Sequence, residues 1–162
     1  MINKVRYHPN GSCLASGSTD KKIKIFDARS QRLLQHYNAH TEAVNSVNFH
    51  PSGNYLISSS QDGTCKIWDL RRGTIMYTLY GHEGASSSAC FSTYGDFFAT
   101  GGNDTVVQLW KTNFEASRGE ILGDMFVADK SRTRHMTSTS EAAPGIKKVI
   151  YGEESKKTVQ EA

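Results

Sequence analysis

The sequence predicts an all-β fold, with three copies of one repeated unit followed by a tail that lacks the repeat. The first observation is a fixed period of 42 residues, which relates several positions of matching chemical type. The second is that each period holds short apolar–polar alternations separated by turn sequences. The positions that share the period are Asp20, Asp62 and Asp104; Phe26, Trp68 and Trp110; Gly11, Gly53 and Gly95; Tyr7, Phe49 and Phe91; His40 and His82; and Pro9 and Pro51.

The middle copy shows the expected strands most clearly. Val44 and Val47 alternate with polar residues and are expected to point into a core. Gly, Pro, Asn and Asp cluster between the strands, and Asp62-Gly63 is a strong hairpin pair. Four antiparallel strands in a repeat of about 40 to 45 residues form one blade of a β-propeller. The expected strands are Val44–Phe49, Tyr55–Ser59, Cys65–Asp69 and Ile75–Leu79.

The chain divides into two regions. Residues 1–112 hold the repeats, at about 1–38, 39–80 and 81–112, and residues 113–162 lose the period. Ser, Thr, Lys and Glu dominate this tail, and its one apolar cluster, Ile121–Val127, is short. Such a segment buries too little surface to offset its ordering entropy, so we expect a flexible, disordered tail. We interpret the basic run Lys130–His135 as a solvated linker, with docking or phosphorylation as the alternative.

Three blades are fewer than the roughly four to eight that close a propeller. No strand pattern follows Trp110-Lys111, so we expect the third blade to lack its fourth strand. The sequence therefore predicts an incomplete ring: a fragment, a truncated isoform or a C-terminal piece of a longer propeller. Its open sheet edges and apolar faces favour self-association.

Composition argues against several classes of partner. The net charge of +3 is too small to indicate nucleic-acid binding. No window approaches 18 consecutive apolar residues, and the N-terminus has no apolar signal-peptide core, so we expect neither a membrane span nor secretion. The spacing of Cys13, Cys65 and Cys90 gives no disulfide framework, and we interpret them as small buried strand residues of a cytosolic protein.

Gly81-His82, Trp68-Asp69 and the recurring hairpin Asp resemble the WD40 repeat family, over residues 1–112. The resemblance implies a propeller that binds other proteins. It also implies hydrogen-bonded tetrads in which a His meets the Asp carboxylate and a Ser or Thr hydroxyl, and that hydroxyl meets the Trp N–H. The implied tetrads are His40, Ser58, Asp62 and Trp68 in the second repeat, and His82, Thr100, Asp104 and Trp110 in the third.

The first repeat departs from the family pattern. It begins at its first strand, with Ile2 aligned to Val44, and so lacks its own Gly-His loop. Phe26 replaces the Trp, which removes the indole donor, and only Ser16 and Asp20 of its tetrad remain.

The sequence predicts no catalytic residue, cofactor or metal site. His, Ser and Asp recur together in successive repeats, as structural parts do, whereas a catalytic triad needs one exposed nucleophile beside an oxyanion site. The His and Cys spacings do not fit zinc, and no phosphate-cradling loop is present.

Longer stretches resemble one branch of WD40 proteins, the proteome-of-centriole family. The likeness covers about residues 2–114 and corresponds to the last three of that family's seven repeats. It implies a scaffold of centrioles and basal bodies that supports centriole integrity and cilium assembly, located in the cytoplasm, cytoskeleton and centrosome, with centriolar or cytoskeletal protein partners. The stretches are Leu34–Tyr37, Phe49–Ser58, Ile75–His82, Phe97–Gly102 and Leu109–Phe114.

The expected binding surface is the face that carries the His loops and the Asp hairpins, because repeat scaffolds present loops on one face. The alternative is that these are ordinary solvated loop residues. The candidate partner-binding residues are Thr19, Gln61, Asn103, Glu42, Asn45, Glu83 and Ser87.

A rival hypothesis comes from Trp68-Asp69-Leu70-Arg71, which resembles the Trp-Asp-x-Arg pattern of cullin ubiquitin ligase substrate receptors. Phe26-Asp27-Ala28-Arg29 is a weaker echo. On this alternative, Arg29 and Arg71 contact the ligase adaptor from the opposite face.

Overall fold

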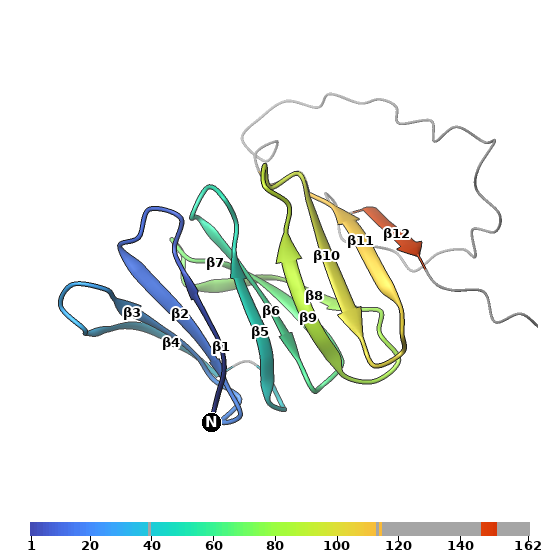
Figure 1. The fold of residues 1–162 in the computed structure, drawn as a ribbon, viewed down its shortest axis with the longest axis horizontal. Helices are drawn as coiled ribbons and strands as arrows, with labels where there is room; N and C mark the ends of the chain where they lie inside the picture. The colour runs from blue at the N-terminus through green and yellow to red at the C-terminus, as the bar shows by residue number, and fades with distance from the viewer. Residues whose placement is uncertain (39, 113, 115–146, 152–162) are drawn as a thin grey trace, which may run out of the picture.

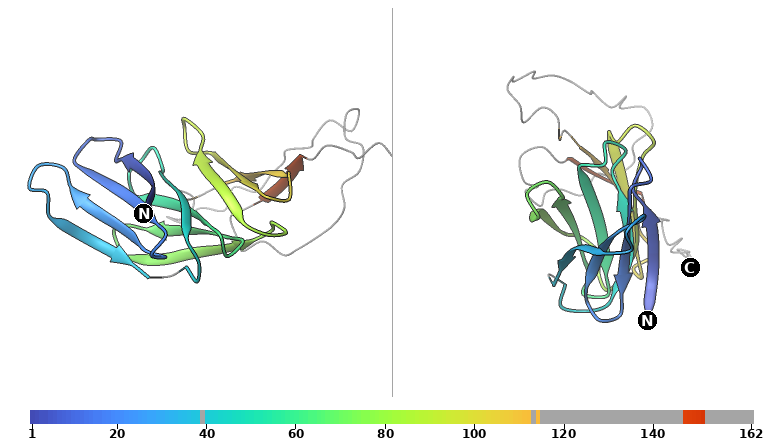
Figure 2. Two further views of the ribbon diagram at one scale, coloured as in Figure 1. Left: turned by 60° about the horizontal axis from the view of Figure 1, so that its bottom comes forward. Right: turned by 90° about the vertical axis from the view of Figure 1, so that its left-hand side faces the viewer.

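The computed structural model describes residues 1–38, 40–112 and 114, together with the backbone of 147–151. These residues form twelve strands and no helix, arranged as three four-stranded antiparallel sheets. The sheets stand side by side in chain order, with the first and third at opposite ends of an open row (Figures 1 and 2). The prediction of an all-β chain of three antiparallel blades is therefore confirmed. None of the described residues forms a helix that could cross a membrane.

In each sheet the strands are neighbours in chain order, and the first strands of adjacent sheets contact each other. The strands of the middle sheet begin and end within one residue of the sequence prediction. The first sheet contains β1 (Ile2–Tyr7), β2 (Cys13–Ser18), β3 (Ile23–Asp27) and β4 (Leu33–Tyr37). The second contains β5 (Val44–Phe49), β6 (Tyr55–Ser60), β7 (Thr64–Asp69) and β8 (Thr74–Tyr80). The third contains β9 (Ser86–Phe91), β10 (Phe97–Gly102), β11 (Val107–Lys111) and β12 (Lys147–Tyr151).

The expectation that the third blade lacks its fourth strand is wrong. β12 pairs antiparallel with β11, with Val149 opposite Leu109 (Figure 1). A sheet edge accepts any extended segment, however far along the chain, so the local pattern after Trp110 could not reveal it. Phe114 also departs from the predicted tail, because it is buried with its ring centroid 4.7 Å from that of Tyr55. The rest of residues 113–162, including both short runs noted above, lies outside the described residues.

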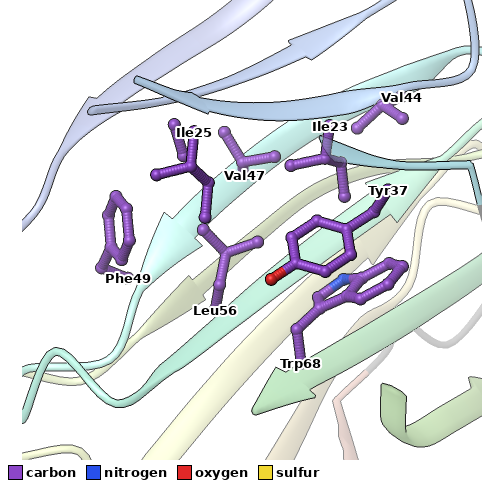
Figure 3. Close-up of a cluster of buried hydrophobic side chains, with 9 residues drawn as sticks. Ile23, Ile25, Tyr37, Val44, Val47, Phe49, Leu56 and Trp68 are labelled. Carbon is purple, nitrogen blue, oxygen red and sulfur yellow. The ribbon is translucent and has the colours of Figure 1, made fainter. Parts of the chain in front are cut away.

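The apolar core lies between neighbouring sheets. Alternate side chains of a strand point to opposite faces, so the middle sheet buries both of its faces. Val44 and Val47 are fully buried, as predicted. The first cluster joins Ala15, Ile23, Ile25 and Tyr37 of the first sheet to Val44, Val47, Phe49, Leu56 and Trp68 of the second (Figure 3). The second cluster joins Tyr55, Ile57, Cys65 and Ile67 of the second sheet to Ala89, Phe98, Trp110 and Phe114.

The three cysteines do not share one environment. Cys65 is buried, where desolvation raises the pKa of its thiol to about 12, and Cys13 is half-buried. Cys90 is exposed, so the prediction that all three are buried is wrong. Ala89 takes the inward position of β9, and its neighbour Cys90 therefore points to the other side.

A histidine joins each blade to the next. His8 Nε2 lies 3.0 Å from the carbonyl oxygen of Gly53, and His50 Nε2 lies 3.2 Å from that of Gly95, one period later. Both glycines have left-handed φ, +75° and +82°. A Cβ at Gly53 or Gly95 would lie 2.3 or 2.1 Å from the Nε2 of its histidine. Glycine is therefore required at these joints for its backbone conformation and for the space above it.

An asparagine forms a second repeated joint. Asn3 Nδ2 donates to the carbonyl of Val44 at 2.8 Å, and Asn45 Nδ2 donates to that of Ser86 at 2.9 Å. Apolar packing and two side-chain hydrogen bonds thus recur, in the same register, at both described joints.

Gly53→Ala is expected to destabilise the chain more than Gly11→Ala does. Gly11 has nearly the same φ, +73°, but nothing lies within 4 Å of a Cβ built there. Gly11→Ala should therefore cost only the left-handed strain, about 1–2 kcal/mol. Gly53→Ala must also displace His8 and should cost about 3 kcal/mol in total. Urea unfolding followed by tryptophan fluorescence measures both, and equal losses would contradict the histidine joint.

Candidate functional site

The four tetrad residues of the second blade are hydrogen bonded to one another. His40 Nδ1 lies 2.9 Å from Asp62 Oδ2, and His40 Nε2 lies 2.7 Å from Ser58 Oγ. The Trp68 indole N–H donates to the same Ser58 oxygen at 3.0 Å. Asp62 also accepts the backbone N–H of Thr41 at 3.0 Å. The set ties the loop before β5 to β6, to β7 and to the hairpin between them.

The third blade repeats this arrangement. His82 Nδ1 lies 2.9 Å from Asp104 Oδ2, and His82 Nε2 lies 2.9 Å from Thr100 Oγ1. Trp110 donates to that threonine oxygen at 3.1 Å. The structure thus brings all eight implied tetrad residues together as two sets, and the loop between β8 and β9 is held to the third sheet.

The first blade holds only part of such a set. The Ser16 hydroxyl meets the carbonyl of Lys24 at 3.5 Å, and Asp20 lies 3.6 Å from the Lys24 ammonium. These two predicted remnants therefore do not bond to each other through a histidine in the described part of the chain.

The directions of the hydrogen bonds keep His40 neutral. Trp68 donates to Ser58, the Ser58 hydroxyl donates to His40 Nε2, and His40 Nδ1–H donates to Asp62. Burial lowers the pKa of His40, and the opposing attraction of Asp62 does not cancel this effect. Because the His40 pKa is lowered in the folded chain, the neutral imidazole contributes to the free energy of unfolding. This contribution is complete above the ordinary histidine pKa of about 6.5, and it is lost as the pH falls through the lowered pKa.

Asp62 is held ionised. Burial by itself raises the pKa of this carboxyl, but hydrogen bonds from Thr64, His40 and the Thr41 backbone outweigh it and hold the pKa well below its usual range. This contribution to stability is present at neutral pH and is lost only in strong acid.

The tetrads hold loops in place and do not present a nucleophile. The Ser58 side chain is fully buried, and its hydroxyl already meets both Trp68 and His40. A triad nucleophile must instead reach substrate at a pocket. Across the part of the chain that the structure describes, no group of three or more His, Cys, Asp or Glu side chains is arranged to hold a metal ion.

Four of the predicted partner-binding residues, Glu42, Gln61, Glu83 and Asn103, lie on loops that the tetrads hold. Thr19 lies in the hairpin of the first blade, and Asn45 and Ser87 lie in β5 and β9. All but one of the seven are exposed. Asn45 is half-buried, and its amide group serves the joint with Ser86. The exposed residues are Thr19, Gln61, Asn103, Glu42, Glu83 and Ser87.

A hollow of about 260 Å³ lies between the Asp hairpin of the second blade and the His loop of the third. Tyr80 borders it with 73% of its surface exposed, and Tyr80 is not among the partner-binding residues predicted from the sequence. The detectable signal was a large aromatic residue directly before Gly81-His82. The hollow is lined by Gln61, Asp62, Gly63, Thr64, Tyr80, Gly81, His82 and Gly84.

Arg29 and Arg71 lie in equivalent turns at the other end of the strands. Both are exposed. The Asp27 carboxylate accepts the Arg29 backbone N–H at 2.8 Å, and Asp69 accepts that of Arg71 at 2.9 Å. The two turns therefore present their arginines in the same way.

Comparison with known proteins agrees with this architecture. The family model described as WD domain, G-beta repeat matches residues 1–27, 31–69 and 73–111, which together make up more than half of the chain. The second and third matches are offset from the sheets by one strand, since 31–69 begins with β4 of the first sheet and 73–111 begins with β8 of the second. The chain belongs to the WD40 repeat family. Domains of this family are generally non-catalytic and commonly bind other proteins, so the fold is that of an interaction scaffold. No curated protein matches the chain.

Ser58→Ala and Ser59→Ala are expected to differ sharply. Both side chains are fully buried, but the Ser59 hydroxyl is one of two buried side-chain atoms without a hydrogen-bond partner among the described residues. Ser58→Ala leaves Trp68 Nε1 and His40 Nε2 unpaired and should lower the free energy of unfolding by about 2–3 kcal/mol. Ser59→Ala should change it by less than about 0.5 kcal/mol. Equal effects in chemical denaturation would contradict the tetrad's role.

Proposed function

We propose that this chain is a non-catalytic protein-binding scaffold of centrioles and basal bodies. Its partners contact the hollow between the Asp hairpin of the second blade and the His loop of the third. The observation that carries the binding site is the exposed Tyr80, set beside two loops that the tetrads hold rigid. An aromatic anchor within a polar rim is a common hot spot of protein interfaces.

The surroundings of Tyr80 suit such an anchor. Gln61 is exposed and lines the hollow from one flanking loop. Glu83 is exposed on the other loop, between His82 and Gly84, which line the hollow. A Cβ at Gly63 would lie 2.8 Å from the carbonyl oxygen of Gly84, so the two loops meet backbone to backbone. A preorganised surface of this kind loses little entropy on binding.

The centriolar role rests on the resemblance of residues 2–114 to the proteome-of-centriole family. On that basis, the partners are centriolar or cytoskeletal proteins, and the binding supports centriole integrity and cilium assembly.

The proposal is tested by imaging the full chain in ciliated cells, with Tyr94→Ala as the matched control. Tyr94 is 85% exposed but lies in the β9–β10 turn, at the other end of the strands. The unmodified chain should concentrate at centrioles, Tyr80→Ala should reduce that enrichment about tenfold, and Tyr94→Ala should leave it unchanged. Diffuse staining of the unmodified chain, or equal loss in both variants, would contradict the proposal.

The same cells test the ligase-receptor hypothesis, which the matching exposure of Arg29 and Arg71 supports. Co-purification of a cullin ligase adaptor that is lost in Arg71→Ala, but kept in Arg72→Ala, would favour that alternative. Arg72 is the suitable control because its side chain is 82% exposed in the same turn.

A further inference from the structure

A second hollow, of about 390 Å³, lies between the first and second blades, at the end of the strands opposite the tetrads. Four of the residues that line it are apolar: Cys13, Ile25, Leu34 and Leu70. Leu34 is 54% exposed, so a large aliphatic side chain meets solvent at the rim. The volume lies within the range of about 300–1,000 Å³ that is typical of ligand sites.

Two turns border the second hollow. Gln35 Nε2 donates to the Leu70 carbonyl at 3.2 Å, which brings β4 of the first blade to the β7–β8 turn of the second. Leu34 lies at the start of β4, just after the β3–β4 turn, so each turn adjoins a side chain of the wall. Each turn carries two exposed arginines, Arg29 and Arg32 in the first and Arg71 and Arg72 in the second.

The aspartates of these two turns do not neutralise the arginines at the surface. Asp69 is 5% exposed, and its Oδ1 accepts the backbone N–H groups of Arg71 and Arg72 at 2.9 and 3.2 Å. Asp27 accepts two backbone N–H groups of its own turn in the same way, at 2.8 and 2.6 Å. Arg72 Nε lies 3.8 Å from Asp69 Oδ2, but its side chain is 82% exposed, and an exposed pair of this kind contributes little.

The two ends of the strands differ in charge. Apart from Asp27 and Asp69, arginine is the only charged residue type in the two turns beside the second hollow. A surface of one sign attracts partners of the opposite sign, so this end suits an acidic partner. The loops at the tetrad end carry more acidic than basic residues, with Asp20, Glu42, Asp62, Glu83 and Asp104 against Lys21 and Lys22.

The lining of the second hollow favours a peptide over a nucleic acid. Single-stranded nucleic acids stack their bases on aromatic side chains, and none of the described residues that line the hollow is Phe, Tyr or Trp. Leu34 and Leu70 instead offer aliphatic surface to a large apolar side chain. The planar guanidinium group of arginine pairs with a carboxylate through two parallel hydrogen bonds. The hollow and its rim therefore match an apolar residue with acidic neighbours.

We propose that the second hollow binds an acidic peptide segment of a partner protein. One large apolar side chain of the peptide packs against Leu34 and Leu70, and carboxylates on either side of it meet the arginines of the two turns. This surface is separate from the hollow beside Tyr80, so the chain holds two partners, one at each end of its strands.

The probe for the test is a fluorescent peptide with one leucine between two runs of three glutamates, added to the full chain and followed by polarisation. It should bind with a Kd on the order of 10–100 μM at low salt, and more weakly as the salt concentration rises. Arg32→Glu and Arg72→Glu should each weaken binding about tenfold, because each replaces an attraction by a repulsion. Neither arginine belongs to the Trp-Asp-x-Arg pattern, so the result is independent of the ligase hypothesis.

Two matched controls separate the hollow from general charge. Lys21→Glu makes the same change of charge at the tetrad end, on a side chain that is 52% exposed, and should change the Kd by less than about twofold. Leu34→Ser should weaken binding about fivefold. Leu33→Ser should leave it unchanged, because Leu33 is 49% exposed beside Leu34 but does not line the hollow.

Three results would overturn the proposal. Equal losses in Lys21→Glu and Arg72→Glu would show that the probe responds only to the overall charge of the chain. Unchanged binding in Leu34→Ser, or no binding at low salt, would show that the hollow does not hold the apolar side chain. An oligonucleotide of equal charge that competes as well as the unlabelled peptide would show that this end binds polyanions and not an acidic peptide.

Discussion

The whole structure depends on the need of each sheet to cover two apolar faces. A four-stranded blade of this length is apolar on both sides, and burial of its side chains is worth roughly 25 cal/mol per Å² of apolar surface. Only a neighbouring sheet can supply that cover. The second sheet meets this requirement on both sides, with Leu56 and Trp68 against the first blade and Ile57 and Ile67 against the third.

The hydrogen bonds of the loops depend on this packing of the sheets. A loop that passes over a buried joint must satisfy its own backbone and side-chain donors. The tetrads do so by running one hydrogen-bond chain from Trp68 through Ser58 and His40 to Asp62. The proposed binding surface is thus a consequence of stability, because the same bonds that complete the core fix the loops beside the exposed Gln61 and Tyr80.

Much of the fold could be predicted from the sequence, because residues at equivalent positions of a repeat lie in similar environments. Apolar–polar alternation and turn sequences within the repeat identified the strands of the middle blade and the burial of Val44 and Val47. The resemblance to the WD40 family implied the residues that form the tetrads. The blade joints were harder to predict. His8 and His50 share the period, but each bonds to a carbonyl group 45 residues away, and no side-chain pattern marks a backbone acceptor. Asn45 was predicted to lie on the partner surface because, in the same way, no side-chain pattern marks the Ser86 carbonyl group to which its amide donates. β12 escaped prediction because edge pairing needs only an extended backbone.

Hydrogen exchange of the full chain, followed by mass spectrometry, tests most directly whether the packing of sheets against each other determines the local stability of the strands. The slowest amides should lie in β6 and β7, since their sheet is covered on both sides. The amides of β2 and β3, which are equally central within a sheet that is covered on one side, should exchange faster. Equal protection of β2–β3 and β6–β7, or faster exchange in β6–β7, would contradict the account.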